Sequence, residues 1–312
     1  MTSHNSALNN EKEKTALLSV CSNSVLVLIK FIVGFALGSV SIISEAIHSG
    51  MDLLASVIAF FSVRKSGEAP DEEHQFGHGK YESVSGMIEA ILIFIAAILI
   101  INEAIQKILA PSYEPMNPVL MWAGIAVMGI SACVNAFVSA RLMKIAQKTE
   151  SIALESDAWH LRTDIYTSIG VMTGLILIWL TGIHLLDSIV AIGIALVIMK
   201  AAYDLTVKSY KDLIDFRLSE KEVSRITSII CDHQSEYVNF HGLRTRRAGP
   251  EIFIDLHLVL DKDITVEQSH DFTEHLEKDL KLEFPRACVT IHVEPNTGEH
   301  LLKPGICNGL IE

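Results

Sequence analysis

Residues 83–106 read SVSGMIEAILIFIAAILIINEAIQ, an apolar run long enough to cross a lipid bilayer. A membrane-spanning helix needs about 20 mostly apolar residues. Outward from this run, five further stretches reach that length, and breaks at Gly38, Pro111 and Gly182 separate several of them. The sequence therefore predicts an all-α transmembrane domain of six helices, over residues 15–38, 39–63, 83–106, 117–140, 155–182 and 186–206.

Composition agrees with a membrane protein and argues against nucleic acid as a partner. Half of the 312 residues are apolar, the mean hydropathy is +0.37, and the apolar residues concentrate before residue 206. That distribution excludes a purely soluble enzyme and a disordered or fibrous chain. The formal net charge of −12 argues against nucleic acid, because phosphate binding needs a concentrated basic face.

The placement of lysine and arginine predicts the orientation in the bilayer. One side carries Arg64, Lys65, Lys80, Arg141, Lys144, Lys148, Lys208 and Lys211. The loops on the other side contribute only Lys107. Because cytoplasmic loops carry the excess of basic residues, we expect both termini in the cytoplasm. The expected location is the inner (plasma) membrane of the cell. No cleavable signal peptide is visible, and the polar residues 1–14 are expected to be a cytoplasmic segment.

A small soluble domain is expected after the sixth span. Residues 219–233 and 265–284 follow a helical period, whereas 238–246, 251–260 and 287–294 alternate as strands do. The order αββαβ predicts an α+β domain with two helices on one face of a small sheet. We therefore expect a transmembrane transport domain at 15–208, a cytoplasmic metal-binding dimerisation domain at 209–296, and a tail at 297–312 that is a candidate for disorder.

Two of the predicted spans carry the same polar pattern, HxxxD. His48 precedes Asp52 in the second span, and His160 precedes Asp164 in the fifth. The i, i+4 spacing places both side chains of a pair on one helix face, about 6 Å apart. Two nitrogens and two carboxylate oxygens suit Zn²⁺ and tolerate Co²⁺, Cd²⁺ or Fe²⁺. The simpler alternative is that these residues only join helices through hydrogen bonds.

A second cluster lies in the turn at 67–82, GEAPDEEHQFGHGKYE. Asp71, His74 and His78 follow the spacing DxxHxxxH, and glycines flank His78 on both sides. Three ligands on one short loop predict a partial metal site completed by water. A solvated polar loop is the alternative interpretation.

A third cluster lies in the soluble domain. His241 and His257 are on predicted strands and His270 on a predicted helix, while His292 and Glu294 alternate with a valine and so face one side of a strand. We expect these side chains to converge on one or two Zn²⁺ ions, although each alone is commonly a surface residue. The other histidines are interpreted as surface residues: His4, His184, His233, His275 and His300.

Together these motifs resemble the cation diffusion facilitator family, in its bacterial-type zinc/iron subgroup. The resemblance runs from about residue 15 to 296 and includes the paired HxxxD motifs, DxxHxxxHGK, HGLRTRRAGP, FIDLHL and IHVEP. It implies a homodimeric, proton-coupled exporter of divalent cations with a ferredoxin-like cytoplasmic domain. It also implies a transport site, a loop site and a binuclear cytoplasmic site on the three clusters above.

Two positions depart from that family, and one further pair follows from it. Relatives often carry Asp where this chain has His48 and Glu294, which leaves Zn²⁺ the expected cation with Cd²⁺, Co²⁺, Fe²⁺ or Mn²⁺ as further candidates. The resemblance also pairs Lys80 with Asp215, after the sixth span, as a charge pair at the dimer hinge. Two unrelated surface charges are the alternative there.

The leading hypothesis is an exporter that exchanges cytoplasmic Zn²⁺ for external protons by alternating access. Zinc in the soluble domain would then be a regulatory or structural ion. Two other classes stay open, a membrane-embedded metalloenzyme whose metal activates water and a metal sensor without transport. Four ligands on two helices form a closed set, so we expect no enzymatic activity.

Overall fold

A computed structural model describes residues 2–37, 40–109, 118–181 and 185–297. The chain divides into two compact units, Met1–Tyr210 and Lys211–Glu312. Almost all of the predicted tail, residues 298–312, lies outside the described residues, as do some side chains within helices, including that of His48.

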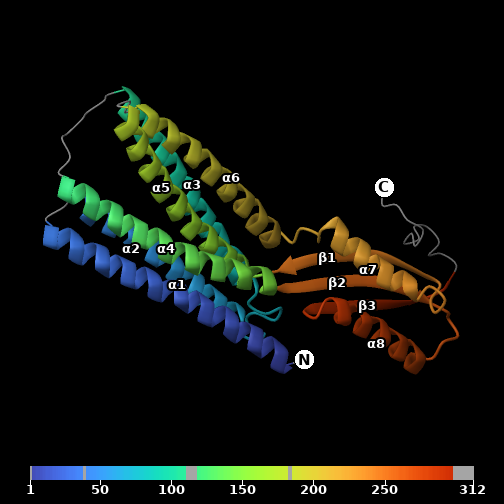
Figure 1. The fold of residues 1–312 in the computed structure, drawn as a ribbon. Helices are drawn as coiled ribbons and strands as arrows, with labels where there is room; N and C mark the ends of the chain where they lie inside the picture. Colours follow the sequence, from blue (N-terminus) through green and yellow to red (C-terminus); the bar gives the residue numbers. More distant parts are fainter. Residues whose placement is uncertain (1, 38–39, 110–117, 182–184, 298–312) are drawn as a thin grey trace. The chain divides into compact units, whose positions relative to one another are not determined.

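The first unit contains six long helices within the described residues (Figure 1). They are α1 (Thr2–Leu37), α2 (Val40–Ser66), α3 (Lys80–Leu109), α4 (Pro118–Thr149), α5 (Ile152–Thr181) and α6 (Leu185–Leu213). Over the described residues, four of them, α1, α3, α4 and α6, are long and apolar enough to cross a membrane. The predicted helical membrane domain is confirmed, whereas six crossings stay a prediction, because the search covers only the described residues.

Small residues allow these helices to pack closely. Gly86 of α3 lies so near α5 that a Cβ there would stand 2.5 Å from Cγ2 of Ile152. Large apolar side chains instead cover the outside, where Phe35 and Phe137 are 69% and 70% exposed. Exposed apolar surface of this kind suits lipid rather than water.

A buried ion pair ties several helices together at one end of this unit. Lys12 Nζ on α1 donates to Glu82 Oε1 on α3 at 2.6 Å, with both side chains almost fully buried. The hydroxyls of Ser66 and Ser151 donate to the same carboxylate. The carboxylate therefore joins α1 and α3 to the end of α2 and the start of α5.

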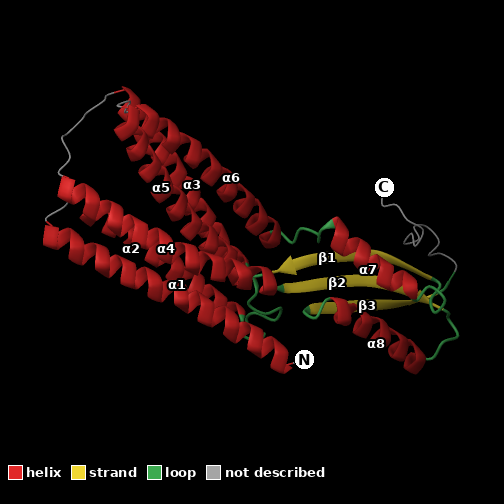
Figure 2. Ribbon diagram, viewed as in Figure 1, coloured by secondary structure: helices red, strands yellow, loops and turns green. Residues whose placement is uncertain are grey.

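The second unit has the predicted αββαβ order (Figure 2). Its elements are α7 (Glu220–Asp232), β1 (Asn239–Ala248), β2 (Glu251–Leu260), α8 (Val266–Glu283) and β3 (Ala287–Pro295). The strand order is β1-β2-β3, with β1 antiparallel and β3 parallel to β2. Capping boxes at Ser219 and Thr265 define where α7 and α8 begin.

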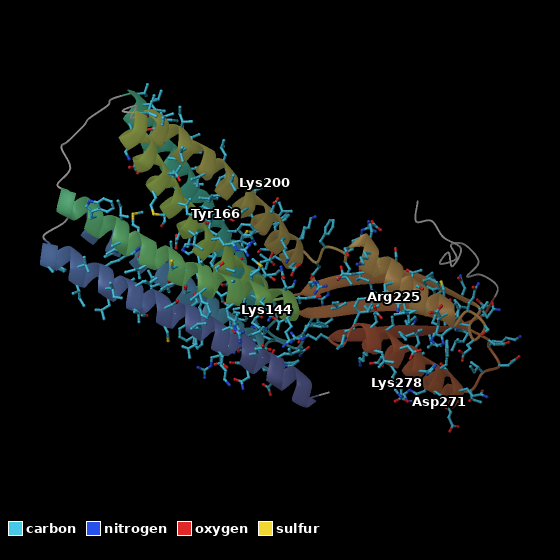
Figure 3. The ribbon with its side chains drawn as sticks, viewed as in Figure 1. Lys144, Tyr166, Lys200, Arg225, Asp271 and Lys278 are labelled. Atoms are coloured by element: carbon cyan, nitrogen blue, oxygen red, sulfur yellow. The ribbon has the colours of Figure 1, made fainter. Side chains whose placement is uncertain are left out.

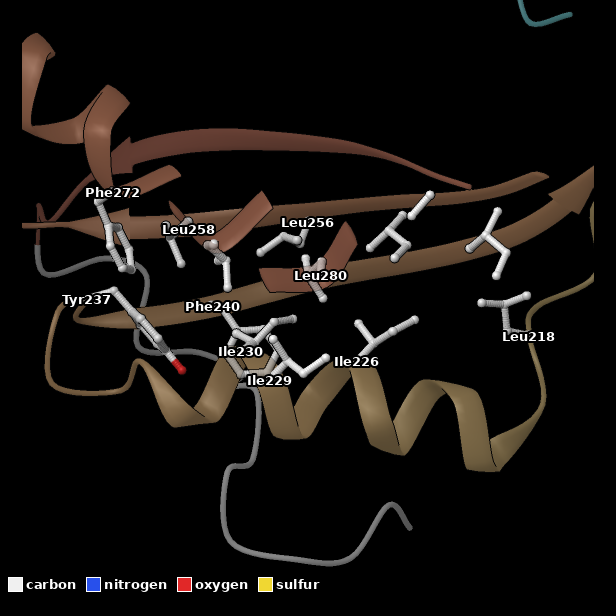
Figure 4. Packing of buried hydrophobic residues seen from close by; sticks show 14 of the residues in the cluster. Leu218, Ile226, Ile229, Ile230, Tyr237, Phe240, Leu256, Leu258, Phe272 and Leu280 are labelled. Carbon is white, nitrogen blue, oxygen red and sulfur yellow. The ribbon is translucent and has the colours of Figure 1, made fainter. Parts of the chain in front are cut away.

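The core of this unit lies between the two helices and one face of the sheet (Figure 4). Ile226 of α7 and Leu280 of α8 pack with alternate residues of β2, including Leu256 and Leu258. Asp271 and Lys278 on the outer side of α8 are exposed (Figure 3). Because strand side chains alternate, His257 of β2 faces the side of the sheet that the helices leave open.

Candidate metal centres

A buried group joins α2 to α5. Asp52, His160 and Asp164 each offer a ligand atom, and these atoms all lie within 4.8 Å of one another. His160 Nε2 is 3.0 Å from Asp52 Oδ1. The HxxxD spacing explains why α5 presents His160 and Asp164 together. His48, the fourth predicted ligand, lies one turn before Asp52 on α2, but its side chain is outside those that the structure describes.

Polar and charged residues of neighbouring helices surround this group. Asn135 Nδ2 of α4 donates to Asp164 Oδ2 at 3.4 Å, and Ser56 Oγ of α2 donates to Asp157 Oδ1 at 3.0 Å. Asp157 and Glu89 are fully buried. The sequence analysis did not select these two acids, whose only signal was a carboxyl within an apolar helix. Several carboxylates in one apolar region favour a bound cation.

The buried group faces a cavity of about 360 Å³ within the helical unit. Its lining includes Asp52, Asn135, His160 and Asp164 together with Lys30 of α1. Lys30 Nζ donates to Ser49 Oγ of α2 at 2.6 Å. A polar cavity between otherwise apolar helices is where membrane proteins hold ions and their paths.

The loop between α2 and α3 forms a second group. Asp71 lies 3.2 Å from both histidines, through Oδ1 to His74 Nδ1 and through Oδ2 to His78 Nε2. His78 is only 2% exposed, and within the described residues neither of its ring nitrogens has a partner with hydrogen-bond geometry. The backbone N–H of His74 lowers the pKa of Asp71, so this carboxyl stays ionised. The predicted three residues are therefore together and able to hold a metal ion.

A third group crosses the open face of the sheet. The strand register places His241, His257 and His292 side by side on β1, β2 and β3. His257 Nδ1 is 2.7 Å from Glu294 Oε1, and His241 Nε2 is 3.6 Å from Glu294 Oε2. His292 Nε2 lies 3.8 Å from the same carboxylate. Gly242 has φ of +63° and permits the approach, since a Cβ there would stand 3.2 Å from the His257 ring.

Two further predictions concern His270 and the pair Lys80 and Asp215. His270 lies on α8, which packs on the opposite face of the sheet from the three histidines, so one protomer does not bring it to them. Within the second unit, Asp215 Oδ1 lies 3.2 Å from Nη1 of Arg246; Lys80 begins α3 of the first unit. The pairing of Lys80 with Asp215 stays a prediction.

The structure also assembles a group that the sequence analysis left on the surface. His233 at the end of α7 lies near His275 and Asp279 of α8, with ligand atoms within 4.8 Å of one another. A signal was present, because His275 and Asp279 repeat the HxxxD spacing of the two helical motifs.

Known proteins share both units of this chain. The cation efflux transmembrane domain matches residues 16–214, and the cytoplasmic domain of cation efflux proteins matches residues 218–296. The chain belongs to the cation diffusion facilitator family. Members of this family are efflux transporters, so the protein is an integral membrane transporter of divalent metal cations.

Similar members of the family include two curated transporters and one solved structure. The uncharacterized transporter sll1263 of Synechocystis sp. is 33% identical over 258 residues, 83% of this chain and 82% of that protein. The cation-efflux pump FieF of Cronobacter sakazakii is 31% identical over 283 residues, 90% of this chain and 92% of that pump. A zinc form of CzrB, described as a zinc transporter, is 40% identical and covers 27% of this chain and 93% of its own, with a TM-score of 0.26.

Proposed function

We propose that this protein exports Zn²⁺ from the cytoplasm in exchange for external protons, through the buried group on α2 and α5. The observation that carries the proposal is the convergence of Asp52, His160 and Asp164 within 4.8 Å inside the helical unit. An exposed cluster would only bind a metal. A buried cluster facing a cavity can hold a cation while the surrounding helices change its exposure.

The donor set supports zinc as the cargo. Imidazole nitrogen and carboxylate oxygen are both zinc ligands, and tetrahedral coordination is the usual arrangement in closed sites. With His48 as fourth ligand, one divalent ion cancels the charge of Asp52 and Asp164. Cd²⁺, Co²⁺, Fe²⁺ and Mn²⁺ remain competitors, because geometry rather than ligand type alone sets selectivity.

Proton exchange follows from the chemistry of the same ligands. A histidine must be neutral to bind metal, so protons compete with Zn²⁺ for His160 Nε2. In the inward-facing state, near-neutral cytoplasm favours the metal. In the outward-facing state, external protons displace it, and the protonated site returns. Rocking of the helices around fixed ligands provides the change of exposure.

In this function the protein is a homodimer in the plasma membrane, with both termini in the cytoplasm. The row of histidines with Glu294 then faces cytoplasmic zinc and acts as a regulatory or structural site. Zinc at one hundred times its Kd would stabilise the binding state by about 2.7 kcal/mol. The loop group would hold the same cation at the cytoplasmic edge, with water completing its coordination.

Zinc flux in proteoliposomes tests the proposal. Asp52→Ala and Asp164→Ala should each reduce zinc-driven flux to background, while Asp204→Ala, at an exposed carboxylate of α6, should retain it. Full zinc transport by either site variant would contradict the assignment of the transport site to this group. The same assay with Cd²⁺, Co²⁺, Fe²⁺ and Mn²⁺ measures the metal selectivity. If one of these ions gives a larger flux than Zn²⁺, that ion and not zinc is the main cargo.

A further inference from the structure

His233, His275 and Asp279 form a compact group between the two helices of the cytoplasmic unit. His233 Nε2 lies 3.0 Å from Asp279 Oδ2, and His275 Nε2 lies 3.9 Å from the same oxygen. The two imidazole rings stand at 87° with centroids 5.1 Å apart. Ligand atoms bound tetrahedrally to one zinc ion are about 3.3 Å apart, given bonds of about 2.0 Å, so the observed distances bracket those of a zinc site.

His233 is held in place from both sides. Its Nδ1 lies 3.1 Å from Glu236 Oε1, and its ring packs against the edge of Phe272. A metal-binding histidine commonly gives its second ring N–H to a carboxylate, which fixes the tautomer and directs the other nitrogen at the metal. Glu236 occupies that position here, leaving Nε2 directed at Asp279.

The two carboxylates around His233 favour a cation at this point. A neutral imidazole carries one N–H and can donate to only one of them. If Nδ1–H donates its hydrogen bond to Glu236, the lone pair of Nε2 faces the carboxylate of Asp279. A metal ion bound between Nε2 and that carboxylate relieves their repulsion. His275 adds the third ligand, because the i, i+4 spacing puts it on the same face of α8 as Asp279.

We propose that this group is a further zinc site, separate from the three groups described above. It would bind Zn²⁺ through His233 Nε2, His275 Nε2 and an Asp279 oxygen, with water as the fourth ligand. The side chains are 11%, 57% and 33% exposed, so the ion can enter from solvent. The bound ion joins the C-terminal end of α7 to α8 and so restrains the two helices that cover the sheet.

Residue-resolved protection of histidines in the full-length protein tests this site. Metal-stripped protein in detergent is treated with diethyl pyrocarbonate with and without Zn²⁺, and mass spectrometry follows each histidine. We expect Zn²⁺ to slow modification of His275 at least about tenfold, and Mg²⁺, which prefers oxygen ligands, to have no effect. Equal modification rates of His275 with and without Zn²⁺ would overturn the proposal.

Variants separate direct binding from effects of zinc elsewhere. Asp279→Asn should abolish protection of His275 and leave that of His257 intact, whereas Glu274→Gln, an exposed carboxylate on the same helix, should change nothing. Glu236→Gln should raise the Zn²⁺ concentration needed to protect His275 by about 10- to 100-fold. Zinc can protect His275 in the parent protein for another reason. If His275 is still fully protected in both Asp279→Asn and Glu236→Gln, the proposed site is wrong.

Discussion

The buried group of the helical unit and the histidine row of the cytoplasmic sheet use the same donors in opposite surroundings. Asp52 and His160 have side chains only 7% and 13% exposed, whereas those of His257 and His292 are 38% and 65% exposed. A metal ion bound on the sheet is accessible to solvent and can exchange with ions in solution. Under the proposed function, a metal ion between α2 and α5 leaves only when helices move, so the same donors would serve transport there and sensing on the sheet.

The surroundings also change what each charge costs. In the helical unit, a carboxylate without its partner is left in a region of low dielectric and is strongly destabilising. On the sheet, water replaces a lost partner. Single substitutions should therefore have large, all-or-none effects in the first unit and graded effects in the second.

The largest difference is expected when one carboxylate is neutralised in each group. Asp52→Asn should reduce zinc flux in proteoliposomes to background, because the proposed site loses one of its two anionic ligands and the charge that balances the divalent ion. Glu294→Gln should preserve the maximal flux. Comparable flux in the two variants would remove the functional distinction between the groups.

The next largest effect concerns stability at the buried ion pair of the helical unit. Glu82→Gln leaves the Lys12 ammonium almost fully buried without a carboxylate and should destabilise the protein by about 3–5 kcal/mol. Arg247→Met, at the partly exposed pair with Glu222, should cost under about 1 kcal/mol. Thermal unfolding of the full chain in detergent measures both, and Lys12→Met/Glu82→Leu should recover part of the loss. Equal losses from the two single variants would mean that burial does not set these costs.

A graded effect is expected at the histidine row. His257→Ala should leave a folded dimer with unchanged maximal flux but should raise the cytoplasmic zinc concentration at half-maximal rate by about tenfold, which corresponds to about 1.4 kcal/mol of lost coupling. Flux against internal zinc, with size-exclusion chromatography of the same sample, measures this. An unchanged zinc dependence, or loss of the folded dimer, would favour a purely structural ion.

The smallest effect is expected at the start of α7. Burial raises the pKa of Glu222, but hydrogen bonds from Ser219 and the Arg247 charge outweigh it and hold that pKa below its ordinary value. The resulting stability is present at neutral pH and is lost as pH falls through the lowered pKa. Ser219→Ala should therefore destabilise α7 by about 1 kcal/mol near pH 7 and by less near pH 4. Hydrogen exchange of the first turn of α7 in the full chain measures both values, and a loss that grows in acid would contradict the assignment.

The sequence predicts some of these groups well because they depend on local periodicity. The i, i+4 spacing correctly places His160 and Asp164 on one face of α5, and strand alternation places Glu294 on the same side as His292. The αββαβ order of the second unit is also predicted, because its strands and helices have different hydrophobic periods.

Other features depend on contacts between distant segments and are not visible in the spacing. Periodicity does not show which face of the sheet α8 covers, and within one protomer α8 packs on the face opposite the three histidines, so a role for His270 at their site stays a prediction. His275 and Asp279 carry a readable HxxxD motif, but His233, which completes the group, lies 42 residues before His275 at the end of another helix. Buried acids such as Asp157 are likewise recognised only once the neighbouring helices are placed.

Simultaneous zinc and proton fluxes in proteoliposomes test most directly the claim that the buried group, and not the sheet group, carries the cargo. In the parent protein and in His257→Ala, an inward zinc gradient should drive protons outward at saturating zinc. In Asp164→Ala both fluxes should fall together to the level of empty vesicles. Zinc flux that persists in Asp164→Ala, or zinc flux that moves no protons in the parent protein, would contradict exchange at the α2–α5 site.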